Sequence, residues 1–345
     1  LAAAADIVPL VDENRVLTKE GINIINTNPR PGIEALMESS NNKQGSLTSG
    51  QIVFTIAPRI NAVGRLGDAE RAVQLLITDN KVKAHELANV LESENYQRRK
   101  IDEDTFDNAL ELFESSTDKD GGSAIILHQE KWHPGVIGIV ASRLVERYYR
   151  PTIMLTTVDG VAKGSARSIS NFNIYEALKK CEDLLIHFGG HKAAAGLAVE
   201  LENLDEFKLK FNQIVKDSIS EDDLSPELHI DSNLKFSEIT PKFLRIMEQF
   251  APFGPGNIRP VFLSENVEIV NTPRIVGTNH LIMGLRQVGC DKTFDAIGFK
   301  MGEYLSMISS YRPLIDIVYN IDKSERDGRI FTQLKLKDLR IKENN

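Results

Sequence analysis

The sequence contains few of the residues that mark a specialised scaffold or location. It has two cysteines among 345 residues, Cys181 and Cys290, and they lie far apart without other metal-ligand spacing. This pattern excludes a disulfide framework and a zinc site and is typical of a reducing compartment, so we expect two core thiols. No apolar run approaches the ~18 residues of a membrane-spanning helix. We therefore expect a cytoplasmic protein of roughly two or three domains.

Several common enzyme signatures are also missing. The sequence has no P-loop, no dinucleotide-binding glycine fingerprint, no nucleophile elbow and no H-E-x-x-H motif. Its net charge of −8 does not favour a polyanionic ligand, but the acidity is uneven. Residues 1–120 carry 13 basic and 20 acidic groups, residues 121–219 carry 12 and 11, and residues 225–345 carry 16 and 15. A nucleic acid can therefore still bind a local basic surface in the later parts.

What the sequence does contain is a change of pattern along its length. Helical periodicity runs from 68 to about 114, with a break at 78–80 and a thin apolar stripe typical of a strut between domains. Over 123–219 short strands alternate with helices, which predicts an α/β domain with a mixed sheet that includes one parallel strand pair. After an acidic linker at 220–228, five or six short strands with one helix around 241–250 predict an OB-like β-barrel, with a sandwich as the alternative.

The most distinctive short motif is "FGGHKAAAG" at 188–196, which contains three glycines and one histidine. Gly189 and Gly190 would let a phosphate approach bare backbone, and His191 would supply a donor. We expect a helix to start after His191 and to add unpaired N–H groups. The alternative is that small residues only let this helix pack closely on a sheet.

Two other motifs carry arginines next to small polar residues. "IAPRINAVGRLGDA" places Arg59 and Arg65 in a segment that we expect to be irregular, where arginines suit bidentate phosphate recognition. Solvated surface arginines are the alternative. "KGSARS" places Ser165 and Arg167 between a strand and a helix, as in an anion cradle. Helix capping would explain the serine but not Arg167.

Three candidate residues are weaker. Asp6 follows an apolar run and could ligate a divalent cation, but one carboxylate is no metal site, and a turn or cap role is the alternative. Trp132 could stack on a base or pack in the core, and His133 before Pro134 could simply close a loop.

Taken together and in order, six motifs resemble the DHH phosphoesterase family, and within it the RecJ-like exonucleases specific for single-stranded DNA. The resemblance covers essentially the whole chain and rests on "ADIVPLVDENRVLTKEG", "IAPRINAVGRLGDA", "HPGVIGIVASRLVERYYRPTIML", "KGSARS", "FGGHKAAAGLAV" and "QFAPFGPGNIRPVF". It implies the end of a DHH catalytic domain over 1–67, connecting helices over 68–118, a DHH-associated α/β domain over 119–220 and an OB-like domain over 221–345.

The resemblance also implies a function. Such enzymes hydrolyse single-stranded DNA from a free 5′ end with two Mn²⁺ or Mg²⁺ ions, in DNA repair and recombination, and a single-strand-binding protein or a helicase is a candidate partner. It implies that Asp6 is a metal ligand. It implies that Ser165 and Arg167 contact the terminal phosphate beside Arg59 or Arg65. It further implies that His191 acts at the substrate backbone as a catalytic residue, next to Gly189 and Gly190.

The sequence departs from the family in one respect. The family's other metal motifs, an Asp-x-Asp strand, a further Asp and the Asp-His-His triplet, do not occur in the sequence, and the chain opens without Met. We therefore expect the C-terminal part of a longer nuclease, which holds substrate but is inactive alone.

Two other functions stay open. One is a stand-alone single-strand-binding module that stacks bases on aromatic side chains of the barrel, with Phe253, Phe262, Phe294, Phe299 and Tyr319 as candidates. The other is a phosphodiesterase of the same family that acts on short oligonucleotides or cyclic dinucleotides.

Overall fold

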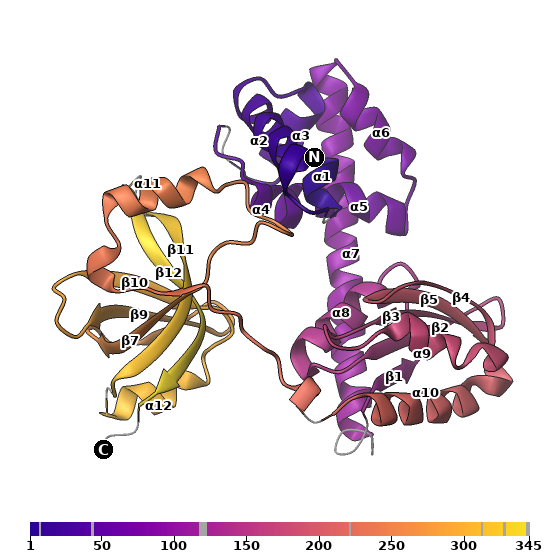
Figure 1. Ribbon diagram of the computed structural model, residues 1–345. Coiled ribbons are helices and arrows are strands. Elements are labelled where there is room, and N and C mark those ends of the chain that lie inside the picture. Colours follow the sequence, from indigo (N-terminus) through magenta and orange to yellow (C-terminus); the bar gives the residue numbers. More distant parts are fainter. Residues whose placement is uncertain are drawn as a thin grey trace. The chain divides into compact units, whose positions relative to one another are not determined.

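The structure is a computed structural model that describes residues 1–6, 8–42, 45–116, 123–220, 222–311, 313–326 and 329–342 (Figure 1). The chain divides into two compact units. The C-terminal unit comprises 1–23, 48–50 and 228–345, and the central unit comprises 24–47 and 51–227. The predicted domain boundaries stay predictions, and those at 118/119 and 220/221 fall at positions outside the described residues or beside them.

Helices form the first part of the central unit. They are α3 (Pro31–Ser39), α5 (Ala57–Leu66), α6 (Glu70–Ile77) and the 35-residue α7 (Lys81–Ser115). The predicted break at 78–80 is confirmed, because the Asn80 side chain accepts the Lys83 N–H at 3.1 Å and so caps the start of α7.

The segment around Arg59 and Arg65 is not irregular, as we had expected, but helical. After the short α4 (Ser49–Gln51), a five-residue π-helix, η1 (Ile52–Ile56), leads directly into α5. Pro58 lies in the first turn of α5, directly after the π-helix, and Gly67 follows the last residue of α5. The proline and the glycine of this motif therefore lie within and at the end of a helical segment rather than in a loop.

A mixed five-stranded sheet forms the second part of the central unit. Its strand order is β1-β2-β3-β5-β4, and β1 and β2 are parallel while all other pairs are antiparallel. This confirms the predicted mixed sheet and its parallel pair. The strands are β1 (Ile125–His128), β2 (Thr152–Val158), β3 (Val161–Arg167), β4 (Leu185–His191) and β5 (Ala194–Glu200).

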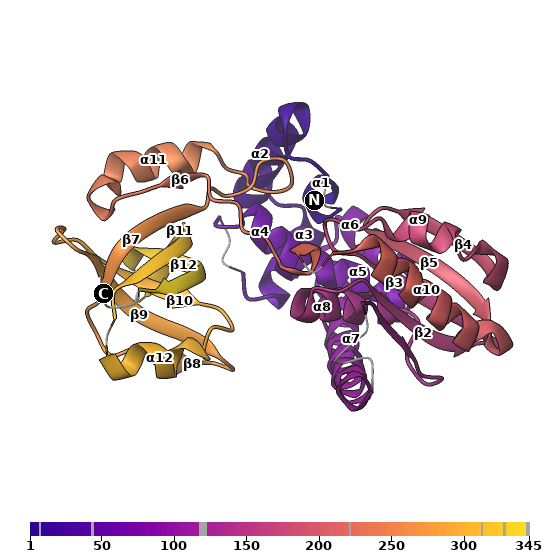
Figure 2. The same cartoon turned by 60° about the horizontal axis from the view of Figure 1, so that its bottom comes forward.

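Helices pack on both faces of this sheet (Figure 2). On one face α9 (Ile174–Lys179) and α10 (Leu204–Ser218) close a core that contains Phe207 and Phe211. On the other face α8 (Ile137–Tyr148) and the end of α7 pack over β1 and β2, with Phe113 and Met154 between them. Short 3₁₀ turns complete the unit: η3 (Glu182–Leu184), η4 (Leu201–Asn203) and η5 (Asp222–Leu224).

The C-terminal unit is built around a ring of strand pairings. β7 pairs with β9, β9 with β10, β10 with β12, β12 with β11, and β11 with β7 again. β6 and β8 attach to β7 and β9. The strands are β6 (Ser232–Asn233), β7 (Phe262–Ile269), β8 (Arg274–Val276), β9 (His280–Gln287), β10 (Thr293–Gly298), β11 (Ile315–Arg326) and β12 (Arg329–Ile341).

Two α-helices lie among the described residues of the C-terminal sequence, whereas we had expected one. The predicted helix is α11 (Pro241–Gln249), and the missed one is α12 (Tyr304–Tyr311), which follows β10. Its sequence mixes serines with apolar residues and carries no strong helical signal of its own. The remaining elements are the short η6 (Phe236–Glu238) and α1 (Ala2–Ala5) and the 16-residue α2 (Asp12–Thr27).

The first residues of the chain belong with its last part. Arg15 on α2 donates from Nη2 to the carbonyl oxygens of Gln249 (2.7 Å) and Ala251 (3.3 Å) at the end of α11. The Leu10 N–H donates to the carbonyl oxygen of Pro255 at 2.6 Å. A cation at a helix C-terminus is favourable, so Arg15 stabilises this junction.

Most of the aromatic side chains that we considered for base stacking lie inward. Phe262 and Tyr319 are buried inside the ring, and the Tyr319 hydroxyl lies 2.9 Å from Ser264 Oγ. Burial raises the pKa of Tyr319 to about 12. Phe299 is exposed, whereas Phe253 is half-buried with the Arg259 guanidinium over its ring. Among the described helices, none is long and apolar enough to cross a membrane.

Candidate functional site

Three of the predicted site residues meet at the first turn of α8. Arg65, in the last turn of α5, donates from Nη1 to the carbonyl oxygen of Gly135 at 2.9 Å. Arg167, at the end of β3, donates from Nη1 to Ser165 Oγ at 2.9 Å and to the Ala166 carbonyl at 2.8 Å. The fold therefore brings Arg65, Ser165 and Arg167 together from motifs about 100 residues apart. We call these three residues the arginine cluster.

Two glycines of the "HPGVIG" stretch make this approach possible. A Cβ added at Gly138 would lie 2.8 Å from both Arg167 Nη2 and Ser165 Oγ, and one added at Gly135 would lie 2.6 Å from the Arg65 carbonyl oxygen. Both separations are shorter than real side-chain contacts allow. The absence of a side chain at Gly135 and at Gly138 is therefore what lets the cluster lie directly against the start of α8. Sequence reasoning missed these glycines.

The cluster is electrostatically uncompensated. Burial and then the positive charge of Arg65 lower the pKa of Arg167. Among the described residues, neither arginine forms an ion pair with a carboxylate. Two guanidinium groups next to the N-terminus of a 12-residue helix favour the binding of an anion. The arrangement is therefore suited to a phosphate group.

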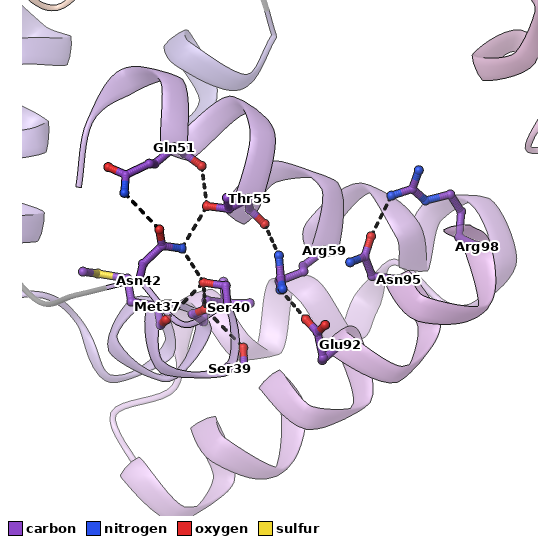
Figure 3. A network of polar contacts seen from close by, with 11 residues as sticks. Met37, Ser39, Ser40, Asn42, Gln51, Thr55, Arg59, Glu92, Asn95 and Arg98 are labelled. Carbon is purple, nitrogen blue, oxygen red and sulfur yellow. Dashed lines mark hydrogen bonds and ion pairs between the residues drawn. The ribbon is translucent and has the colours of Figure 1, made fainter. Parts of the chain in front are cut away.

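Arg59 has a different environment, which Figure 3 shows. Its side chain is 5% exposed, forms an ion pair with Glu92 of α7 and donates from Nη1 to the carbonyl oxygen of Thr55 in the π-helix. Its Nη1 therefore contacts the π-helix and its Nε contacts α7. Of the two arginines that the sequence left equivalent, Arg65 is the one that lies in the cluster.

A network of side-chain hydrogen bonds holds the π-helix next to Arg59 (Figure 3). Asn42 donates from Nδ2 to Ser40 Oγ at 2.6 Å and to Thr55 Oγ1 at 2.9 Å, and it accepts from Gln51 Nε2 at 3.2 Å. Thr55 Oγ1 in turn donates to the Gln51 carbonyl at 2.6 Å. These contacts fix the start of α5, and hence the position of Arg65 at its end.

The glycine-histidine motif forms a β-hairpin, and the helix that we expected after His191 does not exist. Ala194 begins β5, because pairing with β3 and β4 overrides the helix propensity of the alanines. His191 is exposed, and its Nδ1 accepts the Ala193 N–H at 3.2 Å. The expected helix N-terminus therefore contributes nothing to phosphate binding here.

Strand register places this hairpin beside the arginine cluster. Ser165 lies opposite Gly196, which lies opposite Gly189. Arg167 lies opposite Ala194, which lies opposite His191. Because directly opposed residues in antiparallel strands share a face, the two predicted motifs occupy one face of the sheet.

Asp6 stays a prediction. It is exposed, follows the last residue of α1 and belongs to the C-terminal unit. Within the described ranges, no group of three or more His, Cys, Asp or Glu side chains could hold a metal ion. The described residues therefore do not fit a two-metal centre on their own.

The remaining sequence candidates have structural roles. Trp132 is 6% exposed in the core under α8, and its Nε1 donates to Asn108 Oδ1 at 3.0 Å. His133 Nδ1 accepts the Gly135 N–H at 3.1 Å and closes the loop. Burial raises the pKa of Cys181 to about 11, whereas Cys290 is half-buried against the ring core.

Comparisons with known proteins bear on the same regions. Residues 121–217 match the DHHA1 domain family, and residues 230–338 match the RecJ OB domain family. The single-stranded-DNA-specific exonuclease RecJ of Bacillus subtilis (strain 168) is 36% identical over 349 residues, which cover 99% of this chain and 43% of that protein.

Comparison with solved structures finds similarity to the same family. Crystal structures of RecJ from Thermus thermophilus, in complex with Mn²⁺ and with Mg²⁺, each match with a TM-score of 0.83 at 30% identity. Both matches cover 99% of this chain, and they cover 49% and 52% of those chains. The chain thus spans about half the length of these relatives.

Proposed function

The chain belongs to the RecJ family, and from this premise we propose that it is the substrate-holding part of a single-stranded-DNA-specific exonuclease that works from the 5′ end. The observation that carries the proposal is the arginine cluster, in which one hydroxyl and two guanidinium groups that have no carboxylate partner among the described residues converge on a helix start. A terminal phosphate offers more negative charge and more acceptor oxygens than an internal one, so the cluster favours a 5′-phosphorylated end.

Each residue of the cluster has a distinct role in this proposal. Arg167 and Arg65 donate to the phosphate oxygens, and Ser165 adds a hydroxyl while its contact to Arg167 orients the guanidinium. His191 lies in the same sheet row as Arg167 and contacts the substrate backbone beside Gly189 and Gly190. Arg59 positions α5 and does not touch the substrate.

Hydrolysis itself requires divalent cations, which activate water and neutralise charge on the scissile phosphate. Mn²⁺ or Mg²⁺ would serve, and Asp6 is the residue of this chain that we propose as a ligand. Because the described residues do not complete a metal centre, we propose that they bind and orient the strand without cleaving it alone.

We also propose that the strand ring of the C-terminal unit is an OB-type barrel. Five strands with closed pairings and a helix, α12, between the third and fourth strand support this topology. Exposed Phe299 offers a ring for base stacking, and a single-strand-binding protein or a helicase would meet the enzyme on the same strand.

The test is fluorescence anisotropy with single-stranded oligonucleotides that differ only in carrying a 5′-phosphate or a 5′-hydroxyl. We expect tighter binding of the phosphorylated strand, and we expect Arg167→Ala to abolish that preference while residual binding persists. Equal affinities of the unmodified chain for the two ends would contradict end recognition by the cluster.

A stand-alone binding module would give a different result. It would bind both ends alike and would bind internal stretches of long strands as well as ends, because base stacking is independent of the terminus.

A further inference from the structure

The inward stripe of α7 is polar in the middle of the helix. Buried residues recur along α7 at intervals of three or four, which keeps them on one face, except for one gap between Asn95 and Thr105. They are Ala84, Ala88, Leu91, Asn95, Thr105, Ala109 and Phe113. Arg98 and Asp102 continue the same spacing across the gap, and their side chains are only 12% and 13% exposed. Burial of charged groups is costly, so this stretch has a role beyond packing.

The Arg98 guanidinium is held by a neutral side chain. Arg98 donates from Nη2 to Asn95 Oδ1 at 2.7 Å, and Asn95 is fully buried (Figure 3). The contact from Arg98 Nη1 to Asp102 Oδ2 is 3.9 Å long, which is an ion pair but too long for a hydrogen bond. Asn95 therefore fixes the guanidinium, while Asp102 keeps acceptor capacity for other donors.

Asp102 also contacts a second helix. Arg143 of α8 approaches Asp102 Oδ1 with its Nη1 at 3.2 Å, and the Arg143 guanidinium lies 3.8 Å from the centroid of the Phe106 ring on α7. Asp102 Oδ1 is nevertheless buried without a hydrogen-bond partner among the described residues. A buried carboxylate oxygen that accepts no hydrogen bond attracts any donor that can reach it, because leaving it unpaired costs free energy.

Arg65 of the arginine cluster is close enough to interact with this pair. Burial does most to lower the pKa of Arg98, Asp102 raises it, and the positive charge of Arg65 lowers it further. Arg65 nevertheless donates to the Gly135 carbonyl oxygen and, among the described residues, pairs with no carboxylate. Because an arginine side chain is long and binds carboxylates as well as phosphates, Asp102 is a nearby competitor for Arg65.

We propose that Arg98 is a positioning residue that neutralises Asp102 and so keeps Arg65 free to bind the phosphate. The fixed charge of Arg98 attracts Asp102 and repels Arg65, and both forces keep the carboxylate and the cluster arginine apart. Arg143 adds a second countercharge to Asp102 from α8. The inference rests on the proposed function, because it explains how a phosphate-binding arginine stays available next to a buried carboxylate.

A purely structural role of the same residues makes the opposite prediction for Asp102. If Asp102 only joins α7 to α8, removing its charge loosens the start of α8 and weakens binding of the phosphate. If Asp102 competes for Arg65, removing its charge leaves binding intact or strengthens it. The sign of this change therefore distinguishes the two roles.

The test measures, by fluorescence anisotropy, the preference of the full chain for a 5′-phosphorylated over a 5′-hydroxyl single-stranded oligonucleotide. In Arg98→Met, Asp102 competes for Arg65, so we expect the preference to fall by about tenfold, as for the loss of one charge-assisted hydrogen bond. In Asp102→Asn, we expect a preference at least as strong as that of the unmodified chain. In the double variant Arg98→Met with Asp102→Asn, we expect the preference to return.

Arg99→Met is the matched control. Arg99 is exposed and directly follows Arg98 on α7, but it forms no ion pair with Asp102 in the part of the chain that the structure describes. This variant removes the same charge from the same turn of the helix, and it should change the preference by less than about twofold, because exposed charges are screened. Fluorescence of buried Trp132 reports whether each variant is folded.

The outcomes separate this inference from the proposed function. If the unmodified chain binds both ends alike, the proposed function fails. If it prefers the 5′-phosphate, but Asp102→Asn loses that preference or Arg98→Met keeps it in full, the role of Arg98 is overturned and end recognition stands. If Arg98→Met does not fold, the sign of the change in Asp102→Asn decides, and if Asp102→Asn does not fold, the comparison of Arg98→Met with Arg99→Met decides.

Discussion

The two ends of helix α5 carry arginines six residues apart in opposite environments. At its start, Arg59 is buried and paired with Glu92, and its hydrogen bonds stay within the helices. At its end, Arg65 donates to a backbone carbonyl and lies near a second arginine, Arg167. From this difference we propose that the paired arginine stabilises the fold, whereas the two arginines that have no carboxylate partner among the described residues bind a ligand.

The largest effect expected from breaking this contrast is on stability. Arg59→Ala leaves the Glu92 carboxylate without its partner, and we expect a loss of about 3 kcal/mol, the lower end for a broken buried pair, because about a third of Glu92 is exposed. Urea unfolding followed by Trp132 fluorescence measures this loss. Replacing both partners, with Arg59→Met and Glu92→Met, should recover much of it. If Arg59→Ala alone were as stable as the unmodified chain, the stabilising role of the Arg59–Glu92 pair would be contradicted.

An added methyl group next to the arginine cluster should change both the stability of the fold and the binding of the strand. Gly138→Ala places a methyl group against Arg167 and Ser165, and we expect a destabilisation of about 1–3 kcal/mol together with a weaker preference for a 5′-phosphate. The same urea and anisotropy measurements report both. Gly64→Ala is the matched control, because a Cβ at that helical glycine meets nothing within 4 Å. Equal behaviour of the two variants would show that the close approach to α8 is unimportant.

Replacing the arginine at the end of α5 should weaken binding of the strand with little effect on stability, the reverse of what we expect for Arg59. Arg65→Ala removes a charged donor from the cluster but no ion pair, so the free energy of unfolding should change by only about 0.5 kcal/mol. The preference for a 5′-phosphate should fall by about tenfold, as expected for one charge-assisted hydrogen bond. If the preference were lost with Arg59→Ala instead, the two roles would be reversed.

A paired carboxylate in the C-terminal unit extends the comparison to pH. Burial raises the pKa of Asp316, but hydrogen bonds from Arg340, the Asn266 N–H and Lys342 outweigh it and lower the pKa overall. A lowered folded-state pKa stabilises the fold above the unfolded value of about 3.9, and this stability is lost as the pH falls through the folded value.

Asp316→Asn should therefore cost of the order of 1 kcal/mol at pH 7 and progressively less below pH ~4. Thermal unfolding followed by circular dichroism across this range measures the difference. A cost that stays constant on acidification would mean that the carboxylate charge is not what stabilises the fold.

Sequence patterns predicted the structure correctly where contacts between residues close in the sequence determine it. Asn80 caps α7 after the expected break, Asn173 caps α9, and the short apolar runs of 123–219 became strands of a mixed sheet. Ser165, Arg167 and His191 were predicted as site residues from their motifs, and the fold places them on one sheet face.

Other features depend on contacts between distant segments. Ala194–Ala198 has helical propensity, but strand pairing on both sides overrides it. Arg59 and Arg65 look alike in sequence, because only the packing of α5 against α7 gives one of them Glu92 as a partner. Gly135 and Gly138 appear unremarkable until α8 lies against the cluster. Each of these features is set by register or packing, which no local pattern records.

The most direct test of the contrast is an NMR titration of the chain, with arginine Nε–H signals assigned, against a 5′-phosphorylated single-stranded oligonucleotide. We predict that the Arg65 and Arg167 signals shift with the same saturation curve while the Arg59 signal stays in place. A shift of the Arg59 signal, or unmoved signals from Arg65 and Arg167 when the strand is bound, would contradict the proposal that Arg59 stabilises the fold while Arg65 and Arg167 bind the ligand.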